Sequence, residues 1–376
     1  MKKFDNRFNL NEWAGAFGDL GVFIPLVVGY ITIMEMDSLG ILITFGIALI
    51  ATGFYFKTPF PVQPMKVIAG VAIVQMTLIT PGMIWGAGLF TGVFWLILGF
   101  SGALKFIPKL VTKPVILGIV LGLGGSFVIR GISFMADSVV ISILALVLTF
   151  ALLLLKRVPA LLILLMFGIT IGIVQNPELW QELRAIRPEF RLPSFALGNF
   201  TFSELGLGIV LLALPQIPLT LGNAVIATTA QNNKRFPKHP ITEKKVAISQ
   251  GVINLLSPII GGVPMGHGVG GMVSHIRFGA KTGGATIIFG GTLLILGLFF
   301  SNSVLILFGM IPMSILGVIL LFAGIEMGLM SREIGNDKDG FYILLFTALF
   351  SLWNVGLGFL IGIITQELLK RNWLAV

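Results

Sequence analysis

A lysine and a glutamine lie within the stretch TPFPVQPMKVIAG, residues 58–70, among prolines and apolar residues that are otherwise typical of the edge of a membrane helix. A lysine in a membrane interior costs at least about 2.5 to 3.5 kcal/mol on insertion scales, so Lys66 indicates a substrate path or a buried ion pair. Gln63 carries two amide N–H donors, which suit the oxygens of an oxyanion. The alternative is that Lys66 pairs with Asp19 or Glu326, or extends to the cytoplasmic surface from the start of its helix.

A second stretch, GGVPMGHGVGGMVSH at residues 261–275, is equally unsuited to a continuous helix. Prolines in the first stretch and glycines in the second interrupt helical geometry, and each stretch continues into a run that can be helical. The pattern predicts two half-helices that begin within the membrane, near Gln63 and Met265, with their N-termini directed at a common point. Two helix N-termini contribute roughly half a charge each and the Lys66 ammonium adds one, so a local charge of about +2 would match a dianion.

Further polar residues lie in apolar surroundings near these breaks. Asp19, in AFGDLGVF, either couples transport to a proton gradient or neutralises Lys66. Gln216 and Asn223, from a segment that contains two prolines, either line the site or bond carbonyls that the prolines leave free. His267 lies between two glycines, which either allow close approach to a ligand or serve helix packing.

The composition indicates a membrane protein with many spans. Hydrophobic residues make up 56% of the 376 residues and charged residues 11%, against roughly 25% charged in an average soluble domain. Apolar runs of about 20 residues, enough to cross about 30 Å of hydrocarbon, recur along the chain with short breaks. We therefore expect an all-α polytopic membrane protein with about fourteen transmembrane segments, near residues 13–31, 39–56, 63–79, 84–104, 114–131, 138–155, 159–175, 203–220, 246–260, 264–277, 283–301, 303–324, 341–353 and 354–369.

The residue types present argue against other classes of site. The chain contains no cysteine and three histidines, His239, His267 and His275, none of which are spaced four residues apart on a helix. Thiolate sites are thereby excluded, a metal centre is disfavoured, and no cofactor is expected. The polar residues in the spans are single and scattered, which argues against an enzyme. The sequence contains no phosphate-binding loop that ends in Gly-Lys-Ser/Thr, so ATP-driven transport is not expected.

The distribution of charge predicts the orientation. With the N-terminus in the cytoplasm, only Arg130, Arg184, Arg187 and Arg191 of the 25 lysines and arginines fall on the outside, and Lys66 falls in a span. Cytoplasmic loops are enriched in Lys and Arg, so both termini are expected to be cytoplasmic, in a bacterial or archaeal cytoplasmic membrane. The net charge of +9 then reflects topology, and no nucleic-acid partner is expected.

The longest external connection, residues 176–202, contains NPELWQELRAIRPEF, in which charged and apolar residues at helical spacing predict a short amphipathic surface helix. This connection divides the chain into residues 1–175 and residues 203–376, with about seven spans each. An odd number of spans in each half places the halves in opposite orientations, as in an inverted repeat.

Four stretches resemble signature sequences of the molybdate transporter family, a branch of the sulfate permease superfamily. They are EWAGAFGDLGVFIPL (12–26), PVQPMK (61–66), PQIPLTLGNAV (215–225) and GGVPMGHGVGGMVSHIRFGAKTGG (261–284). The resemblance runs from Glu12 to Glu326 and implies about seven plus seven spans in inverted repeats, divided into a core and a gate domain. It also implies that an oxyanion binds between the third and tenth spans and that the core moves against the gate in alternating access. The family's usual Thr-Cys is replaced by Met265 and Gly266, which removes a hydroxyl donor.

The resulting hypothesis is a secondary active transporter of a tetrahedral oxyanion, molybdate in the first place, with tungstate or sulfate as alternatives. A sulfate or nucleobase symporter of the same fold and a passive anion channel are the competing functions. The lipid bilayer is the expected partner, and a homodimer is left open. Asp19 and Glu326 are expected to provide coupling or a counter-charge, and the predicted substrate-binding residues are Gln63, Met65, Lys66, Gly266, His267, Gly268, Val269, Gly270, Gln216 and Asn223.

Overall fold

The computed structural model describes residues 6–105, 112–154, 160–196, 198, 200–371 and 373. The expected spans and domain ranges also include residues 1–5, 106–111, 155–159, 197, 199, 372 and 374–376, which lie outside the described residues. The described chain is mainly helical, as the apolar runs predict, and the only strands in this part of the chain are two of two residues each. The elements are α1 (Leu10–Ala16), α2 (Leu20–Val28), α3 (Ser38–Phe56), β1 (Gln63–Pro64), α4 (Lys66–Val74), α5 (Pro81–Ser101), α6 (Lys113–Met135), α7 (Val139–Leu154), α8 (Ala160–Gln175), α9 (Leu179–Ala185), α10 (Phe202–Gly208), α11 (Leu214–Leu219), α12 (Thr228–Arg235), α13 (Glu243–Leu256), β2 (Met265–Gly266), α14 (Val269–Arg277), α15 (Gly284–Gly309), α16 (Met313–Leu329), α17 (Lys338–Trp353) and α18 (Val355–Lys370).

Shorter π-helical and 3-10 segments continue several of these helices. The π-helical segments are η1 (Gly29–Ile33), η4 (Ile209–Ala213) and η5 (Thr220–Ala227), and the 3-10 segments are η2 (Ala103–Lys105), η6 (Ser257–Ile260) and η7 (Met330–Ile334). Two of the π-helical segments flank α11, whose proline at position 218 lacks the N–H that a regular helix requires.

Membrane-crossing helices are recognised by their length and hydropathy. Within the described residues, six helices qualify, and a seventh span results if the bent pair α1 and α2 with η1 counts as one. The other expected spans correspond to shorter helices, such as the nine-residue helices α4 and α14, that do not cross a bilayer alone. The chain is thus a multi-pass membrane protein, and the total of about fourteen spans stays a prediction.

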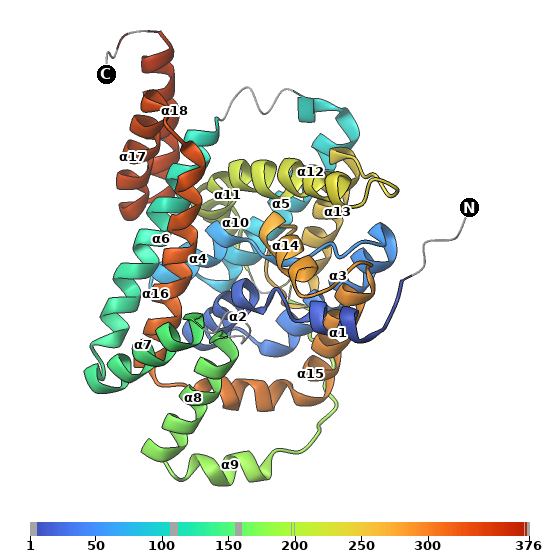
Figure 1. The fold of residues 1–376 in the computed structure, drawn as a ribbon, viewed down its shortest axis with the longest axis vertical. Coiled ribbons are helices and arrows are strands. Elements are labelled where there is room, and N and C mark those ends of the chain that lie inside the picture. Colours follow the sequence, from blue (N-terminus) through green and yellow to red (C-terminus); the bar gives the residue numbers. More distant parts are fainter. Residues whose placement is uncertain are drawn as a thin grey trace.

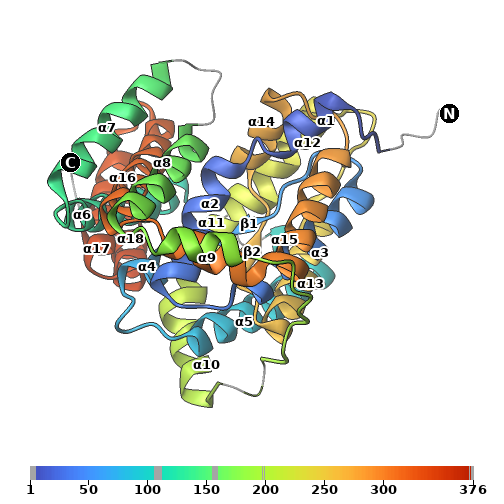
Figure 2. The same ribbon diagram turned by 90° about the horizontal axis from the view of Figure 1, so that it is seen from below.

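The helices form two groups that lie side by side (Figures 1 and 2). In one group α3 packs along α15 and α5 along α13, and α1, α10 and α14 join them. In the other group α6 packs along α16 and α17, and α7, α8 and α18 complete it. α11 contacts α6 and α18 from the second group, and η5, which continues α11, contacts α13 and α14 from the first. The segment that carries Gln216 therefore lies at the boundary between the two groups.

Glycines allow the closest helix contacts. A Cβ built on Gly131 in α6 would lie 2.6 Å from the carbonyl oxygen of Gly317 in α16, and the reverse distance is also 2.6 Å. In the other group, a Cβ on Gly290 in α15 would lie 2.6 Å from the carbonyl oxygen of Gly46 in α3. Small residues let backbones approach in a membrane, where the hydrophobic effect gives little drive for helix association. The two main helix pairs are therefore held by backbone proximity.

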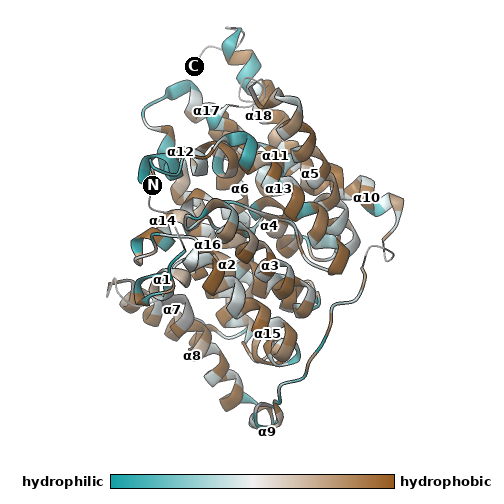
Figure 3. Ribbon diagram, turned by 90° about the vertical axis from the view of Figure 1, so that its right-hand side faces the viewer, coloured by the Kyte–Doolittle hydropathy of each residue, from teal (hydrophilic) through white to brown (hydrophobic). Residues whose placement is uncertain are grey.

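Hydrophobic residues dominate the middle of the molecule, and hydrophilic residues gather at α12, at the C-terminal end and along the connection after α9 (Figure 3). The predicted surface helix within residues 176–202 is present as α9. Trp180 in this helix is 46% exposed, and the guanidinium of Arg184 lies 5.1 Å from the centre of its ring. Such an arrangement suits an amphipathic helix at the membrane surface.

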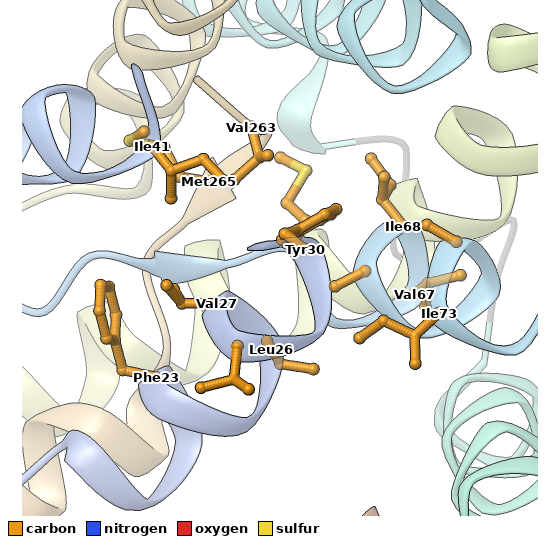
Figure 4. Packing of buried hydrophobic residues seen from close by; sticks show 14 of the residues in the cluster. Phe23, Leu26, Val27, Tyr30, Ile41, Val67, Ile68, Ile73, Val263 and Met265 are labelled. Atoms are coloured by element: carbon orange, nitrogen blue, oxygen red, sulfur yellow. The ribbon is translucent and has the colours of Figure 1, made fainter. Parts of the chain in front are cut away.

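An apolar cluster lies beside the two strands and holds the half-helices in place. Tyr30, from the π-helical turn after α2, lies between the side chains of Met265 on β2 and Ile68 on α4 (Figure 4). All three side chains are buried, with at most 2% of their surface exposed, so the two broken segments share one packed support.

Candidate functional site

The two broken segments cross at a short antiparallel pair. Gln63 pairs with Gly266 and Pro64 with Met265, and Met65 N–H donates to the Pro264 carbonyl at 3.0 Å. Each strand ends close to the N-terminus of a helix: α4 begins at Lys66 and α14 at Val269. The two helices that the sequence predicts after the breaks are thus present, and they begin three or four residues later than expected because the strands occupy the first positions. That they begin within the membrane stays a prediction.

Lys66 is the first residue of α4 and lies at a small cavity between the two segments. The cavity volume is about 20 Å³, and roughly 10–15 Å³ is sufficient for one water molecule. In the part of the chain that the structure describes, Lys66 forms no ion pair with a carboxylate within 4.0 Å. The residues that line the cavity are Gln63, Pro64, Met65, Lys66, Gln216, Leu219, Thr220, Asn223, Gly266 and His267.

Gln63 is tied to Asp19 at one edge of this cavity. Its Nε2 donates to Asp19 Oδ1 at 2.5 Å, and both side chains are buried. The other oxygen of Asp19, Oδ2, has no hydrogen-bond partner among the described residues and lies against α14, 2.6 Å from a Cβ built on Gly271. The carboxylate and the amide therefore form one buried polar pair near the start of α4, where the Lys66 side chain is only partly buried.

One face of the α11–η5 segment reaches both half-helix N-termini. Gln216 Oε1 accepts from Val67 N–H at 2.8 Å and from Ile68 N–H at 3.4 Å, both in the first turn of α4. Asn223, seven residues or about two turns later, accepts with Oδ1 from Val269 N–H at 3.4 Å in the first turn of α14. The sequence left open whether these two amides line the site or bond free carbonyls, and both of them line the cavity. Their oxygens also accept hydrogen bonds from the first turns of the two helices.

His267 joins the two crossing segments through its ring. Nδ1 lies 2.9 Å from the Pro61 carbonyl oxygen and Nε2 lies 3.0 Å from Ser249 Oγ. A carbonyl oxygen only accepts, so Nδ1 carries the proton, and a neutral ring then accepts at Nε2 from the serine hydroxyl. The ring also packs edge-on against Phe56 and Phe60. Both nitrogens are therefore engaged by protein groups, although the residue borders the cavity.

Two side chains that the sequence analysis missed hold the second strand. Asn254 accepts with Oδ1 from Met265 N–H at 2.9 Å and donates from Nδ2 to the Met265 carbonyl at 2.6 Å. Gln250 donates to the same carbonyl at 2.5 Å and accepts from His267 N–H at 3.1 Å. Both residues lie on α13 and are fully buried. The signal available in the sequence was a pair of amides four residues apart in SQGVINLLSP, which places them on one helix face.

The remaining predicted residues are less central. Gly268, Val269 and Gly270 form the start of α14, and none of the three is among the residues that line the cavity. Glu326 is exposed on α16 and forms no ion pair with Lys66 within the described chain. The described residues thus show no contact between Glu326 and Lys66 that would support the predicted role of Glu326 as a counter-charge.

No arrangement for a metal ion is found in the described residues, where no three His, Cys, Asp or Glu side chains come together. His275 is used differently: its Nδ1 lies 2.7 Å from the Gly15 carbonyl and links α14 to α1. The site consists of amides, backbone N–H groups and one ammonium, which are donors suited to an oxyanion.

Comparison with known proteins identifies the family. The family described as "Molybdate transporter of MFS superfamily" matches residues 11–127 and 208–327, more than half of the chain. The chain belongs to this molybdate transporter family. Molybdate transporter 2 of Arabidopsis thaliana is 32% identical over an alignment of 414 residues that covers 97% of this chain and 88% of the relative. Molybdate transporter 1 of Chlamydomonas reinhardtii is 26% identical, with 94% and 90% covered.

Solved structures of transporters share the fold of this molybdate transporter family member. The transmembrane domain of the cyanobacterial bicarbonate transporter BicA matches with a TM-score of 0.69 and 15% identity, covering 97% of this chain and all of that domain. Murine Slc26a9, an anion transporter solved in the inward-facing state, matches with a TM-score of 0.69 and 14% identity, covering 97% of this chain and 69% of its own. The sulfate permease-like fold expected from the sequence is thereby confirmed.

Proposed function

We propose that this protein is a secondary active transporter of a tetrahedral oxyanion and that molybdate is its main substrate. The support is the family to which the chain belongs and the names of its relatives, which are molybdate transporters. The alignments cover 88% and 90% of these relatives. Tungstate and sulfate are the alternative substrates because they have the same shape and charge. The family and the fold favour transport over catalysis.

The observation that carries the proposal is the position of Lys66. Its side chain borders a cavity between the starts of α4 and α14, and no carboxylate within the described chain lies within 4.0 Å of its ammonium. Two helix N-termini add roughly half a positive charge each. A doubly charged anion would balance this charge, with Gln63, Met65, Gly266, Gln216 and Asn223 along the cavity wall and with Asp19 and residues 268–270 outside that lining.

Transport is proposed to occur by alternating access between the two helix groups. The group with α3, α5, α13 and α15 corresponds to the core of the family, and the group with α6, α16, α17 and α18 corresponds to the gate. The cavity lies next to the boundary, because its wall includes residues of α11, which contacts the second group, and of η5, which contacts the first. This arrangement supports a 7+7 inverted repeat, with residues 1–175 and 203–376 as the repeats and residues 176–202 as the connection.

A nucleobase symporter is the second candidate. A probable uracil permease of Haemophilus influenzae is 27% identical over 269 residues, which covers 66% of this chain and 62% of that protein. A neutral base gains little from an ammonium beside its site, whereas a dianion gains a favourable charge interaction. Lys66 therefore favours the oxyanion over the base.

The proposed orientation places both termini in the cytoplasm, which follows from the distribution of Lys and Arg. A bacterial or archaeal membrane stays a prediction from the sequence, since the relatives named above as molybdate transporters come from a plant and an alga. A homodimer also stays a prediction.

Uptake into sealed proteoliposomes tests the proposal. Purified protein should accumulate radiolabelled molybdate against its concentration gradient when a proton gradient is imposed, and unlabelled tungstate should compete while uracil should not. A passive channel would only equilibrate the anion. Competition by uracil at the concentration at which molybdate competes would contradict the proposed substrate class.

A further inference from the structure

Gln216 occupies backbone donors at the start of α4. Its Oε1 accepts from the N–H groups of Val67 and Ile68, the second and third residues of the helix. The orientation of the side-chain amide is fixed because backbone N–H groups only donate, and its Nε2 donates to Thr220 Oγ1 at 2.8 Å. The first N–H groups of a helix have no partner within the helix and are the donors that bind anions. A protein oxygen therefore already uses two of the donors that an oxyanion would need.

The same side chain forms part of the cavity wall beside Lys66. The cavity holds about 20 Å³, and one water molecule needs roughly 10–15 Å³. An anion with four oxygens on a central atom needs several times the room of a water, so part of the wall has to move before it enters. Displacing Gln216 would provide room and two N–H donors in the same step.

We propose that Gln216 is an internal acceptor that the oxyanion displaces from the N-terminus of α4, so that competition between the amide oxygen and the anion sets the affinity. This inference rests on the proposed function and adds a determinant of specificity to it. Hydrogen bonds to an ionised acceptor are roughly twice as strong as those to a neutral one, so a dianion competes well for these N–H groups. A neutral or weakly charged solute of similar size does not gain enough to displace the amide.

A direct binding role for Gln216 makes the opposite prediction. If its Nε2 turned toward the anion and donated to it, loss of the side chain would remove a ligand and weaken binding. If its Oε1 competes with the anion, loss of the side chain leaves the N–H groups of Val67 and Ile68 without an acceptor, and binding becomes tighter.

The experiment measures molybdate affinity by calorimetry for purified wild-type protein, Gln216→Met and Gln216→Glu. Methionine has a similar length and accepts hydrogen bonds only weakly, so the dissociation constant should fall by about fivefold or more. Glutamate places a full negative charge on the same N–H groups, so the dissociation constant should rise by more than a hundredfold while the unfolding temperature stays the same or rises. Gln75→Met, at the opposite end of α4, is the matched control and should bind as the wild type does.

The outcomes separate this inference from the proposed function. If the wild-type protein binds molybdate and Gln216→Met binds it more weakly, the role of Gln216 as an internal acceptor would be wrong, and the transporter proposal would stay intact. An unchanged molybdate affinity in Gln216→Glu would also show that Gln216 is not an internal acceptor. The glutamate variant therefore tests the proposal even if the methionine variant does not fold. A wild-type protein that binds neither molybdate, tungstate nor sulfate would overturn both.

Discussion

Gln63 donates its amide hydrogen to Asp19, with 2.5 Å between Nε2 and Oδ1, at the edge of the cavity that also contains Lys66. This bond connects the segment before α2 to the first strand, so the first span and the half-helix α4 are joined by buried polar groups. It also means that Gln63 offers a substrate only the donor that Asp19 does not use.

The bond between Gln63 and Asp19 should contribute to stability. Asp19→Leu removes the acceptor and leaves a buried amide donor unpaired, which costs about 1–3 kcal/mol. We expect the free energy of unfolding in detergent to fall by about that amount, measured by denaturant titration. Asp137→Leu, at an exposed position, is the control and should change stability little. Equal stability of the two variants would show that the bond does not support the fold.

Asp19→Asn separates the two roles that the sequence allows for this carboxylate. The asparagine keeps an oxygen for Gln63 and removes the negative charge. If Asp19 couples transport to protons, molybdate uptake driven by a proton gradient should be lost while exchange of labelled for unlabelled molybdate continues. Gradient-driven uptake at the wild-type rate would assign Asp19 to charge balance with Lys66 instead.

The clamp on the second strand should be required for both stability and binding. Asn254→Ala removes the acceptor of Met265 N–H and one donor to its carbonyl, at a fully buried position. We expect a loss of about 2–4 kcal/mol in unfolding free energy, since three buried hydrogen bonds are lost, including the one to the Gln250 carbonyl, and the Met265 N–H loses its side-chain acceptor. The dissociation constant for molybdate should rise in the same variant, because β2 precedes the start of α14.

Asn176→Ala, at an exposed position outside the site, controls for the loss of an asparagine side chain. Thermal unfolding and calorimetry of both variants in one detergent provide the comparison. An Asn254→Ala protein with wild-type affinity would mean that the strand keeps its position without the clamp.

Gly268 should not tolerate a side chain. A Cβ at this position would overlap Gln63 Oε1, so alanine would push the amide away from its place beside Asp19. We expect Gly268→Ala to weaken molybdate binding by about tenfold, which corresponds to about 1.4 kcal/mol. Gly291→Ala is the matched control, since a Cβ there meets nothing within 4 Å and alanine favours a helix over glycine by up to about 1 kcal/mol. Similar affinities in both variants would contradict the close contact.

The breaks in the two half-helices could be predicted from the sequence because proline and glycine act locally. The prolines of residues 58–64 remove helix donors and the glycines of residues 261–268 weaken a helix whatever the fold, whereas Gly270 and Gly271 are accommodated within α14. The pairing of β1 with β2 could not be predicted in the same way, because residues some 200 positions apart meet only after the helices have packed. This pairing explains why α4 and α14 begin later than expected.

The roles of the buried amides also depended on tertiary structure. Gln216 and Asn223 lie in a proline-containing apolar segment. From the sequence they were expected either to line the site or to bond carbonyls that the prolines leave free. That their oxygens accept from the first turns of α4 and α14 follows only from the position of the α11–η5 segment. Gln250 and Asn254 were missed because two amides on one helix face do not show which neighbouring segment that face contacts.

The charge of Lys66 carries the proposed function, so its removal is the most direct test. At an effective dielectric of about 20, a unit charge pair about 4 Å apart is worth roughly 4 kcal/mol before desolvation is subtracted. The net effect is smaller, and we expect Lys66→Met to weaken binding by about 2 kcal/mol or more, a factor of about 30 in the dissociation constant. Lys66→Arg keeps the charge, but the broader guanidinium should fit poorly in a cavity of about 20 Å³.

The decisive measurement is therefore the dissociation constant of molybdate for wild-type protein and Lys66→Met, determined by calorimetry together with the unfolding temperature in the same preparation. We expect a dissociation constant at least about 30 times higher in Lys66→Met, with an unfolding temperature close to that of the wild type. An unchanged dissociation constant with a much lower unfolding temperature would contradict it, because Lys66 would then be a structural counter-charge to Asp19.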